Sequence, residues 1–351
     1  MEAVSFARGV PAPECIPVEE LADCAETVLR RDGRTLLSYG DAAGYIPLRS
    51  LVARWFEVHP YRVVLTNGAL SGLGLLAQRF GRNQNVFVEY PTYDRANNLF
   101  LAAGGALTAV VVDEHGMDPE DMALHLQTTM RPALTYVIPT FQNPTGHTMS
   151  LERRRRVVEM IDMYDLLVVE DDPYGLVRYE GEPVPALFDL SGGRCIYMSS
   201  FSKTISPGLR VGFMILPSDE LAAAVVEEAS SAYITPVLTG QAIVHEFISR
   251  GAFEPNLERV KGLLRVRRDA MLTALEKHFS GAKWSRPNGG YFVWLELPPG
   301  TVAQTVIDRA EGVTAVAGQA FGGMPNTVRL AFSFAAPDEI EAGIERLAAA
   351  V

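Results

Sequence analysis

Short apolar runs alternate with stretches of helical periodicity between residues 47 and 217. Seven of these runs are predicted to be strands: Val63–Leu65, Val86–Glu89, Thr108–Val112, Thr135–Ile138, Leu167–Glu170, Cys195–Met198 and Val211–Leu216. Strands that alternate with helices are joined by crossovers, which place them parallel and cover both faces of the sheet. The pattern therefore predicts an α/β fold whose large domain contains a mainly parallel, seven-stranded sheet.

The pattern changes after residue 217. A nearly unbroken helical stretch runs from about residue 218 to 279, with interruptions near Thr235-Pro236 and Gly251. Strand-like runs at 284, 291–296, 315–317 and 327–333 and a last helix at 338–349 indicate a smaller α+β C-terminal domain. We expect an N-terminal arm and helix over residues 1–35, a large domain over 36–245 and a small domain over 246–351.

Charge and composition exclude several classes of partner. The net charge of −11 argues against non-specific nucleic-acid binding. No apolar run approaches the roughly 20 residues of a membrane span, and the amino end shows no signal peptide. Cys15, Cys24 and Cys195 are odd in number and lack metal-ligand spacing. We therefore expect a cytoplasmic protein with reduced thiols, no metal site, and neither nucleic acid nor membrane as a partner.

Lysine is rare in this chain, and the first one is Lys203. Arginine keeps its proton in proteins, whereas a lysine amine can lose it and act as a nucleophile. The reaction that requires an amine is Schiff-base formation with a carbonyl, including that of pyridoxal phosphate (PLP). Ser200, Ser202 and Arg210 lie close in sequence and could cradle a phosphate. On this segment alone, a solvated lysine in a polar loop is the alternative.

Other predicted strand ends carry polar groups that suit a bound pyridine ring. Asp171 follows a buried run, and a carboxylate beside the ring nitrogen would favour the protonated ring, which is the stronger electron sink. Tyr174 and Asn143 could reach the ring 3-oxygen, and Tyr93 could stack on the ring. The alternatives are a magnesium- or sugar-binding acidic turn at Asp171, a plain turn at Asn143 and simple packing of Tyr93.

A glycine-containing turn, Thr66-Asn67-Gly68-Ala69-Leu70-Ser71-Gly72, opens a predicted helix. Exposed amides at the start of a helix bind anions readily. This turn is weak evidence by itself, but its combination with the amine, the carboxylate and the amide is specific.

Three motifs together resemble the class I/II aminotransferases of PLP fold type I: Asn143-Pro144-Thr145-Gly146, Asp171-x-x-Tyr174, and Ser200-x-Ser202-Lys203 through Pro207-Gly208-x-Arg210-x-Gly212. The residues of these motifs are most similar to those of the 2-aminoadipate aminotransferase-like subgroup. This subgroup also forms the effector domain of MocR-type regulators. The resemblance covers residues from about 5 to the end. It implies transfer of the amino group of an L-amino acid to a 2-oxo acid through a Schiff base on Lys203.

The resemblance also implies a role for each matching residue. Lys203 moves the proton between the substrate α-carbon and C4′ of the cofactor, and Asp171 pairs with the pyridine nitrogen. Tyr174 and Asn143 form hydrogen bonds to the 3-oxygen of the ring, and Tyr93 stacks on the ring. The implied phosphate site consists of Gly68, Ala69, Leu70, Ser200, Ser202 and Arg210.

Further roles concern the substrate and a second subunit. Arg329 resembles the arginine that grips the substrate α-carboxylate, and Gly40 and Asn143 resemble residues of the same pocket. Tyr45 resembles a tyrosine that reaches the phosphate of a partner subunit, which implies a homodimer with shared active sites.

Some features leave alternatives open. Ala69 and Leu70 stand where relatives often carry hydroxyl or amide side chains. Arg8 lies in a segment that covers the active site in relatives. It either binds a group of the substrate or is an ordinary surface residue. Another PLP reaction on an amino acid (decarboxylation, elimination or cyclisation) and a non-catalytic MocR-like sensor are the alternative functions. The sequence does not identify the donor amino acid.

Overall fold

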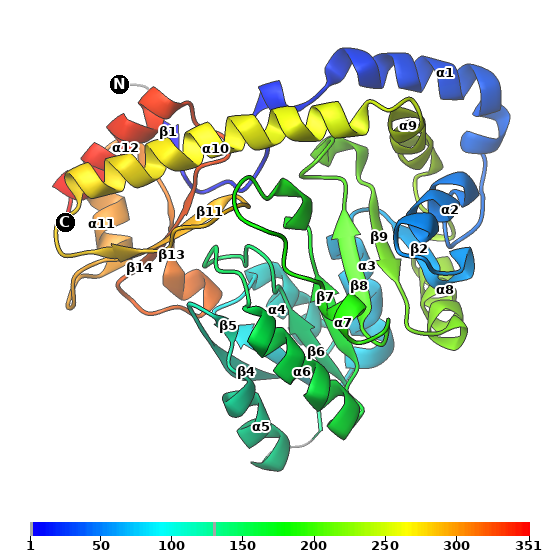
Figure 1. Cartoon of the computed structure of the whole chain (residues 1–351), viewed down its shortest axis with the longest axis horizontal. Helices are drawn as coiled ribbons and strands as arrows, with labels where there is room; N and C mark the ends of the chain where they lie inside the picture. Colours follow the sequence, from blue (N-terminus) through cyan, green and yellow to red (C-terminus); the bar gives the residue numbers. More distant parts are fainter. Residues whose placement is uncertain (1–2, 129–130) are drawn as a thin grey trace.

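The computed structural model describes residues 3–128 and 131–351, which form a large and a small β-sheet with helices packed around both (Figure 1). Met1 and Glu2 of the predicted arm lie outside the described residues.

Eight strands form the large sheet, in the order β2-β9-β8-β7-β6-β3-β4-β5. Their bounds are β2 (Val63–Thr66), β3 (Asn85–Tyr90), β4 (Ala106–Asp113), β5 (Gly116–Met117), β6 (Leu134–Val137), β7 (Val168–Asp171), β8 (Ile196–Ser200) and β9 (Gly212–Ile215). β9 is antiparallel to both of its neighbours and β5 to β4, and the other pairs are parallel. All seven predicted strands are present. The predicted count of seven is one short, because two-residue β5 is too brief to leave a pattern.

Helices cover both faces of this sheet. They are α2 (Ile46–Trp55), α3 (Ala69–Leu76), α4 (Asp94–Ala102), α5 (Pro119–Thr128), α6 (Leu151–Tyr164), α7 (Leu187–Leu190), α8 (Asp219–Tyr233) and α9 (Leu238–Ser249). Successive strand residues point to opposite faces. Val86 and Val88 accordingly pack in one buried cluster with Phe100 of α4, whereas Phe87 packs in another with Met122 of α5. The sheet is therefore buried on both sides, as predicted.

The small sheet has the order β10-β11-β14-β13, and all its pairs are antiparallel. The elements of this part are α10 (Phe253–His278), β10 (Lys283–Trp284), β11 (Phe292–Glu296), α11 (Ala303–Arg309), β12 (Val313–Thr314), β13 (Val316–Ala317), β14 (Thr327–Ala331) and α12 (Pro337–Ala349). The long helical stretch is interrupted between α8 and α9 and again between α9 and α10. These interruptions contain Thr235-Pro236 and Gly251, where the sequence predicted them. α9 runs across residue 245, and the three domain limits stay a prediction. Within residues 3–128 and 131–351, no helix combines the length and apolarity needed to cross a bilayer.

The N-terminal arm is attached to the small sheet before the chain enters α1 (Val18–Leu36). β1 (Val4–Ser5) pairs in parallel with β12. Phe6 is fully buried, and its carbonyl accepts a hydrogen bond from the Ala331 N–H at 2.9 Å. Ser333 Oγ donates to the carbonyl of Val10 at 2.8 Å. Residues 4–10 are therefore fixed along one side of the small domain.

We expect Phe6→Ala to destabilise the protein by about 3–5 kcal/mol, because it removes a fully buried aromatic ring from the core. The ring lies against Gly343, where an added Cβ would approach it to 2.6 Å. Urea unfolding measures the loss. Phe334→Ala, at a ring that is 43% exposed, is the matched control and should change stability far less. Equal losses in the two variants would contradict the structural role of Phe6.

Candidate active site

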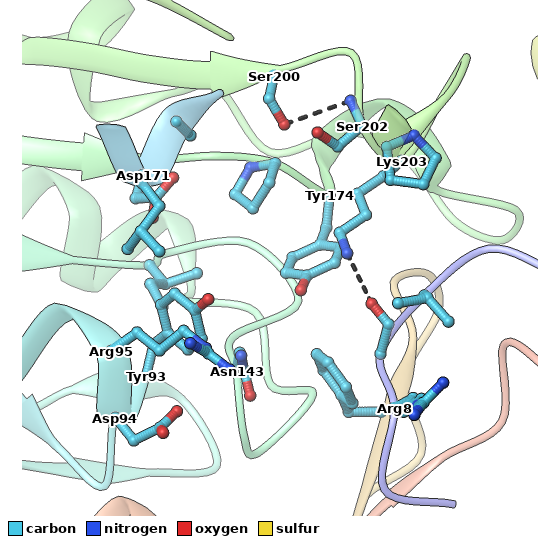
Figure 2. Close-up of a pocket in the computed structure, with 18 of the residues that line it drawn as sticks. Arg8, Tyr93, Asp94, Arg95, Asn143, Asp171, Tyr174, Ser200, Ser202 and Lys203 are labelled. Atoms are coloured by element: carbon cyan, nitrogen blue, oxygen red, sulfur yellow. Dashed lines mark hydrogen bonds between the residues drawn. The ribbon is translucent and has the colours of Figure 1, made fainter. Parts of the chain in front are cut away.

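A cavity of about 590 Å³ lies at the carboxyl ends of the large-sheet strands and is also lined by the arm and the small domain. Eleven of the predicted site residues line it: Ala69, Leu70, Tyr93, Asn143, Asp171, Tyr174, Ser200, Ser202, Lys203, Arg210 and Arg329. Figure 2 shows most of them around a common space. Parallel strands that end at one edge of a sheet account for this convergence.

Lys203 lies just after β8, and its amine points toward the arm. Nζ donates a hydrogen bond to the Gly9 carbonyl at 2.6 Å (Figure 2). Burial, together with the charges of Arg329 and Arg210, lowers the pKa of Lys203 to about 8. Because this value is close to neutral pH, an appreciable fraction of the amine is unprotonated and able to act as a nucleophile or a base.

Asp171 is the last residue of β7, and its two carboxylate oxygens have different surroundings. Oδ2 accepts a hydrogen bond from the Tyr136 hydroxyl at 2.6 Å. Oδ1 is buried and has no hydrogen-bond partner within the described part of the chain. Burial raises the pKa of Asp171 to about 7, against the lowering effect of the Tyr136 bond. A buried oxygen without a partner is costly, so this atom is a ready acceptor for a cationic N–H in the cavity.

The predicted phosphate site is assembled from β8, α3 and Arg210. Ser200 Oγ accepts a hydrogen bond from the Ser202 N–H at 3.4 Å. The guanidinium of Arg210 is exposed and donates to the carbonyl of Asn67 at 3.1 Å. An arginine, two hydroxyls and the N-terminus of an α-helix are the usual donors to a phosphate.

Two glycines allow these groups to approach closely. A Cβ on Gly68 would lie 2.5 Å from the Arg210 guanidinium, and a Cβ on Gly212 would lie 2.5 Å from the Ala69 nitrogen. Gly68 also has a φ of +91°. It does not line the cavity itself, but it sets the turn that presents the amides of Ala69 and Leu70.

Arg329 of β14 is buried at 8% exposure and holds two fixed contacts. It donates to Asn143 Oδ1 at 3.0 Å and to the Ala7 carbonyl at 2.6 Å. Its Nε is buried and has no acceptor among the described residues. The rings of Phe292 and Phe321 lie 4.6 and 4.5 Å from the guanidinium carbon. The free donor capacity and the apolar surroundings suit a carboxylate ligand.

Tyr174 and Tyr93 flank the middle of the cavity. Tyr174 is buried, and Lys203 Nζ lies 5.8 Å from its ring centroid. Tyr93 is partly buried immediately before α4. Burial raises the pKa of both phenols, so both stay protonated at neutral pH. Each ring can stack on, or donate to, a flat ligand.

Gly40 and Tyr45 do not line the cavity of their own chain. A Cβ on Gly40 would lie 2.5 Å from Leu238. Tyr45 is partly buried against His245, with ring centroids 5.9 Å apart. The predicted role of Tyr45 requires a second subunit, and the predicted roles of both residues stay predictions.

The sequence analysis missed several residues that line this cavity or hold its lining residues in place. Tyr136 lies in the middle of β6, where it resembles an ordinary core residue; the one available signal was that a buried phenol needs a hydrogen-bond partner. Ala7 and Gly9 contribute only backbone carbonyls, which no side-chain pattern reveals. Asp94 and Arg95 follow Tyr93 at the start of α4 and line the cavity as well.

The donor set fits PLP. The unpartnered Asp171 oxygen suits a pyridinium N–H, the Arg210 cradle suits a phosphate, and the Lys203 amine suits an aldehyde. No cluster of three or more histidine, cysteine, aspartate or glutamate side chains able to hold a metal ion occurs in residues 3–128 and 131–351.

Comparison with known proteins agrees with this geometry. The family described as aminotransferase class I and II matches residues 9–347. A 2-aminoadipate transaminase of Thermus thermophilus is 38% identical, over 99% of this chain and 90% of the relative. Aromatic-amino-acid aminotransferase 1 of Thermococcus litoralis is 34% identical, over 99% of this chain and 87% of the relative. The crystal structure of the Thermus thermophilus α-aminoadipate aminotransferase LysN, complexed with N-(5'-phosphopyridoxyl)-L-leucine, superposes with a TM-score of 0.94 at 37% identity. It covers 99% of this chain and 92% of that one.

The chain therefore belongs to the class I and II aminotransferases. The predicted family, the PLP fold type I architecture, the aminotransferase activity on amino acids and the PLP cofactor are confirmed.

We expect Tyr136→Phe to raise the pKa of Asp171, because the lost hydrogen bond stabilised the carboxylate. PLP affinity then falls at low pH, since only the carboxylate holds a pyridinium. The pH below which the PLP dissociation constant begins to increase should rise by about 1–2 units. This shift is the equivalent of one hydrogen bond to a charged group. Titration of the apoprotein with PLP across pH measures this shift. Tyr164→Phe, at the end of α6 and outside the cavity, should leave the pH dependence unchanged; an unshifted pH dependence in Tyr136→Phe would refute the role of the hydroxyl.

Proposed function

We propose that the cavity carries the transamination of an L-amino acid with a 2-oxo acid and that Lys203 is the catalytic lysine. The observation that supports this most is the presence, in one cavity, of an amine with a lowered pKa and a buried carboxylate oxygen that lacks a partner. Neither is explained by folding alone, because each costs stability.

Asp171 holds a proton at the pyridine nitrogen in this proposal. PLP, when bound, supplies an electron sink for the electrons released at the substrate α-carbon. A pyridinium beside Asp171 favours the carboxylate form, which offsets the effect of burial on its pKa. The Tyr136 hydroxyl keeps the second oxygen in place and turns the first toward the cavity.

Lys203 moves a proton at the substrate α-carbon. Its main chain is held by the Tyr291 hydroxyl, which donates to the Lys203 carbonyl at 3.1 Å. The Lys203 amine can leave the Gly9 carbonyl, because this carbonyl is an uncharged acceptor and holds the amine by one hydrogen bond. A base with a pKa near 8 is effective near neutral pH.

Arg329 binds the substrate α-carboxylate through its free Nε and its remaining guanidinium hydrogens. Asn143 and Ala7 fix the plane of the guanidinium, so a bidentate carboxylate meets donors that are already oriented. Phe292 and Phe321 exclude water on both sides and strengthen the ion pair.

A homodimer with shared active sites is part of the proposal. The exposed apolar side chains Leu37 (75%) and Tyr39 (77%) come from the loop around Gly40, and Ile46 (61%) begins α2 directly after it. This loop lies against the start of α9, which follows the exposed Ile234 and Val237. Clustered exposed apolar side chains favour a protein interface. Tyr45 belongs to this surface and would reach the phosphate of the partner.

We further propose a cytoplasmic protein of amino-acid metabolism, with biosynthesis as the role. Its three cysteines are all buried as free thiols, and such thiols suit a reducing compartment.

Lys203→Ala should abolish transamination, because no other described lysine lines the cavity. The measurement is a half-reaction with a stoichiometric amino donor, which yields pyridoxamine phosphate and the 2-oxo acid. Lys261→Ala, on α10, is the control and should retain full activity. Turnover of the Lys203→Ala protein at the wild-type rate would refute the proposal.

The wild-type half-reaction separates the alternatives. Release of ammonia or carbon dioxide identifies another PLP reaction, and binding without turnover identifies a sensor.

Mixing Lys203→Ala with Tyr45→Ala should restore about one quarter of the wild-type activity. In a mixed dimer, one site regains both an intact lysine and a partner's intact tyrosine, and random assembly makes about half of the dimers mixed. Each variant alone should be nearly inactive. Lys203→Ala mixed with Asp171→Ala is the control, because both residues serve the same site and no mixed dimer contains an intact one. Equal activity in the two mixtures would show that the sites are not shared.

A further inference from the structure

Arg8 lines the active-site cavity on the arm side (Figure 2). Its side chain is exposed and makes no hydrogen bond or ion pair with any residue in 3–128 or 131–351. The other arginine of the deep cavity, Arg329, has two fixed acceptors. Arg8 is therefore a cation at the cavity wall without a structural task.

The backbone around Arg8 is held on both sides. The carbonyl of Phe6 accepts from Ala331, that of Ala7 from Arg329, and that of Gly9 from Lys203. Gly9 packs so tightly on the Phe292 ring that an added Cβ would lie 2.4 Å from it. An anchored backbone fixes the origin of the Arg8 side chain, so a ligand that binds the guanidinium has to order the side chain but not the backbone.

The charges that line the cavity are unbalanced. Five basic side chains, Arg8, Arg95, Lys203, Arg210 and Arg329, face two acidic ones, Asp94 and Asp171. The proposed function assigns the cofactor phosphate to Arg210, the ring nitrogen to Asp171 and the α-carboxylate to Arg329. Asp94 adjoins Arg95 in sequence at the start of α4, on the opposite side of the cavity from Arg8 in Figure 2. This accounting leaves Arg8 and Arg95 without an assigned anion. Arg95 adjoins the carboxylate of Asp94 in sequence, whereas both chain neighbours of Arg8 are uncharged.

Arg8 also lies close to the groups that hold the substrate. Its two neighbours in the chain reach Arg329 and Lys203 with their carbonyls, so a substrate bound at its α-carboxylate and α-carbon extends past the arm. We propose that Arg8 is a specificity-determining residue that binds a second, distal carboxylate, and that the substrates are acidic amino acids and their 2-oxo acids. This inference rests on the proposed function of the site.

The test compares acids with their amides, which match in shape and differ in charge. The kcat/KM of Arg8→Gln is measured with glutamate and glutamine, and with aspartate and asparagine. We expect a loss of about 10- to 100-fold for the better acid, the range of a charge-assisted hydrogen bond, and less than about a 3-fold change for its amide. Arg8→Lys should recover part of the loss, because it keeps the charge without the planar fork.

A binding measurement adds a readout without turnover. Glutarate carries two carboxylates and no amine, whereas pentanoate has the same chain length and one carboxylate. Arg8→Gln in the PLP-loaded enzyme should weaken glutarate inhibition by a similar factor and leave pentanoate unchanged. Arg309→Gln, at an exposed arginine of α11 outside the cavity, removes the same charge and should alter neither.

The outcomes separate this inference from the proposed function. Equal effects of Arg8→Gln on acid and amide, or on glutarate and pentanoate, overturn the role of Arg8. A wild-type enzyme that transaminates other amino acids but no acidic one also overturns it. If no amino acid is transaminated, the proposed function fails, and an Arg8-dependent preference for glutarate still supports the distal carboxylate site.

Discussion

The carboxylate of Asp171, which has a hydrogen-bond partner among the described residues for only one of its oxygens, is the group on which ligand binding in the cavity most depends. One oxygen receives the Tyr136 hydroxyl and the other is buried without a partner, although an unpaired buried oxygen costs free energy. Arg329 repeats the arrangement with the opposite charge, because two of its nitrogens are bonded while Nε is not. Between them lies an amine whose pKa is lowered by burial. The fold thus holds two unsatisfied polar atoms and one amine of lowered pKa around one space.

The arm ties these groups to the small domain through its backbone. The carbonyls of Ala7 and Gly9 accept hydrogen bonds from Arg329 and Lys203, while Phe6 and Val10 on either side are bonded to the strand and loop of the small domain. In the proposed function the cofactor aldehyde takes the Lys203 amine from the Gly9 carbonyl, whereas the Ala7 carbonyl keeps its bond to Arg329 while the substrate carboxylate meets the free Nε. The arm therefore gives up one hydrogen bond when the cofactor binds and keeps the bond that orients Arg329.

The position of polar residues at the strand ends was largely predictable from the sequence, whereas contacts between distant segments were not. Apolar runs and helical periodicity predicted every long strand of the large sheet. Polar residues after those runs predicted Lys203, Asp171 and Asn143 as site residues. β5 was missed because two residues carry no periodicity. Tyr136 was missed because its partner is 35 residues away on the next strand. The role of Tyr45 cannot be tested within one chain, because the phosphate that it would contact belongs to another copy, and the role of Gly40 stays a prediction.

The proposed function and the proposed role of Arg8 put catalysis and substrate choice on different parts of the chain. The residues proposed to handle protons lie at or just after the ends of buried strands, where a change of residue alters the core as well as the cavity. Arg8 lies on an exposed position of an arm whose neighbours are fixed through their backbone, so its side chain can change without loss of those contacts. The arrangement lets the distal specificity vary while the amine, the carboxylate and the phosphate cradle stay the same. The cavity has more basic than acidic side chains although the chain carries a net charge of −11, and this local excess favours anionic ligands.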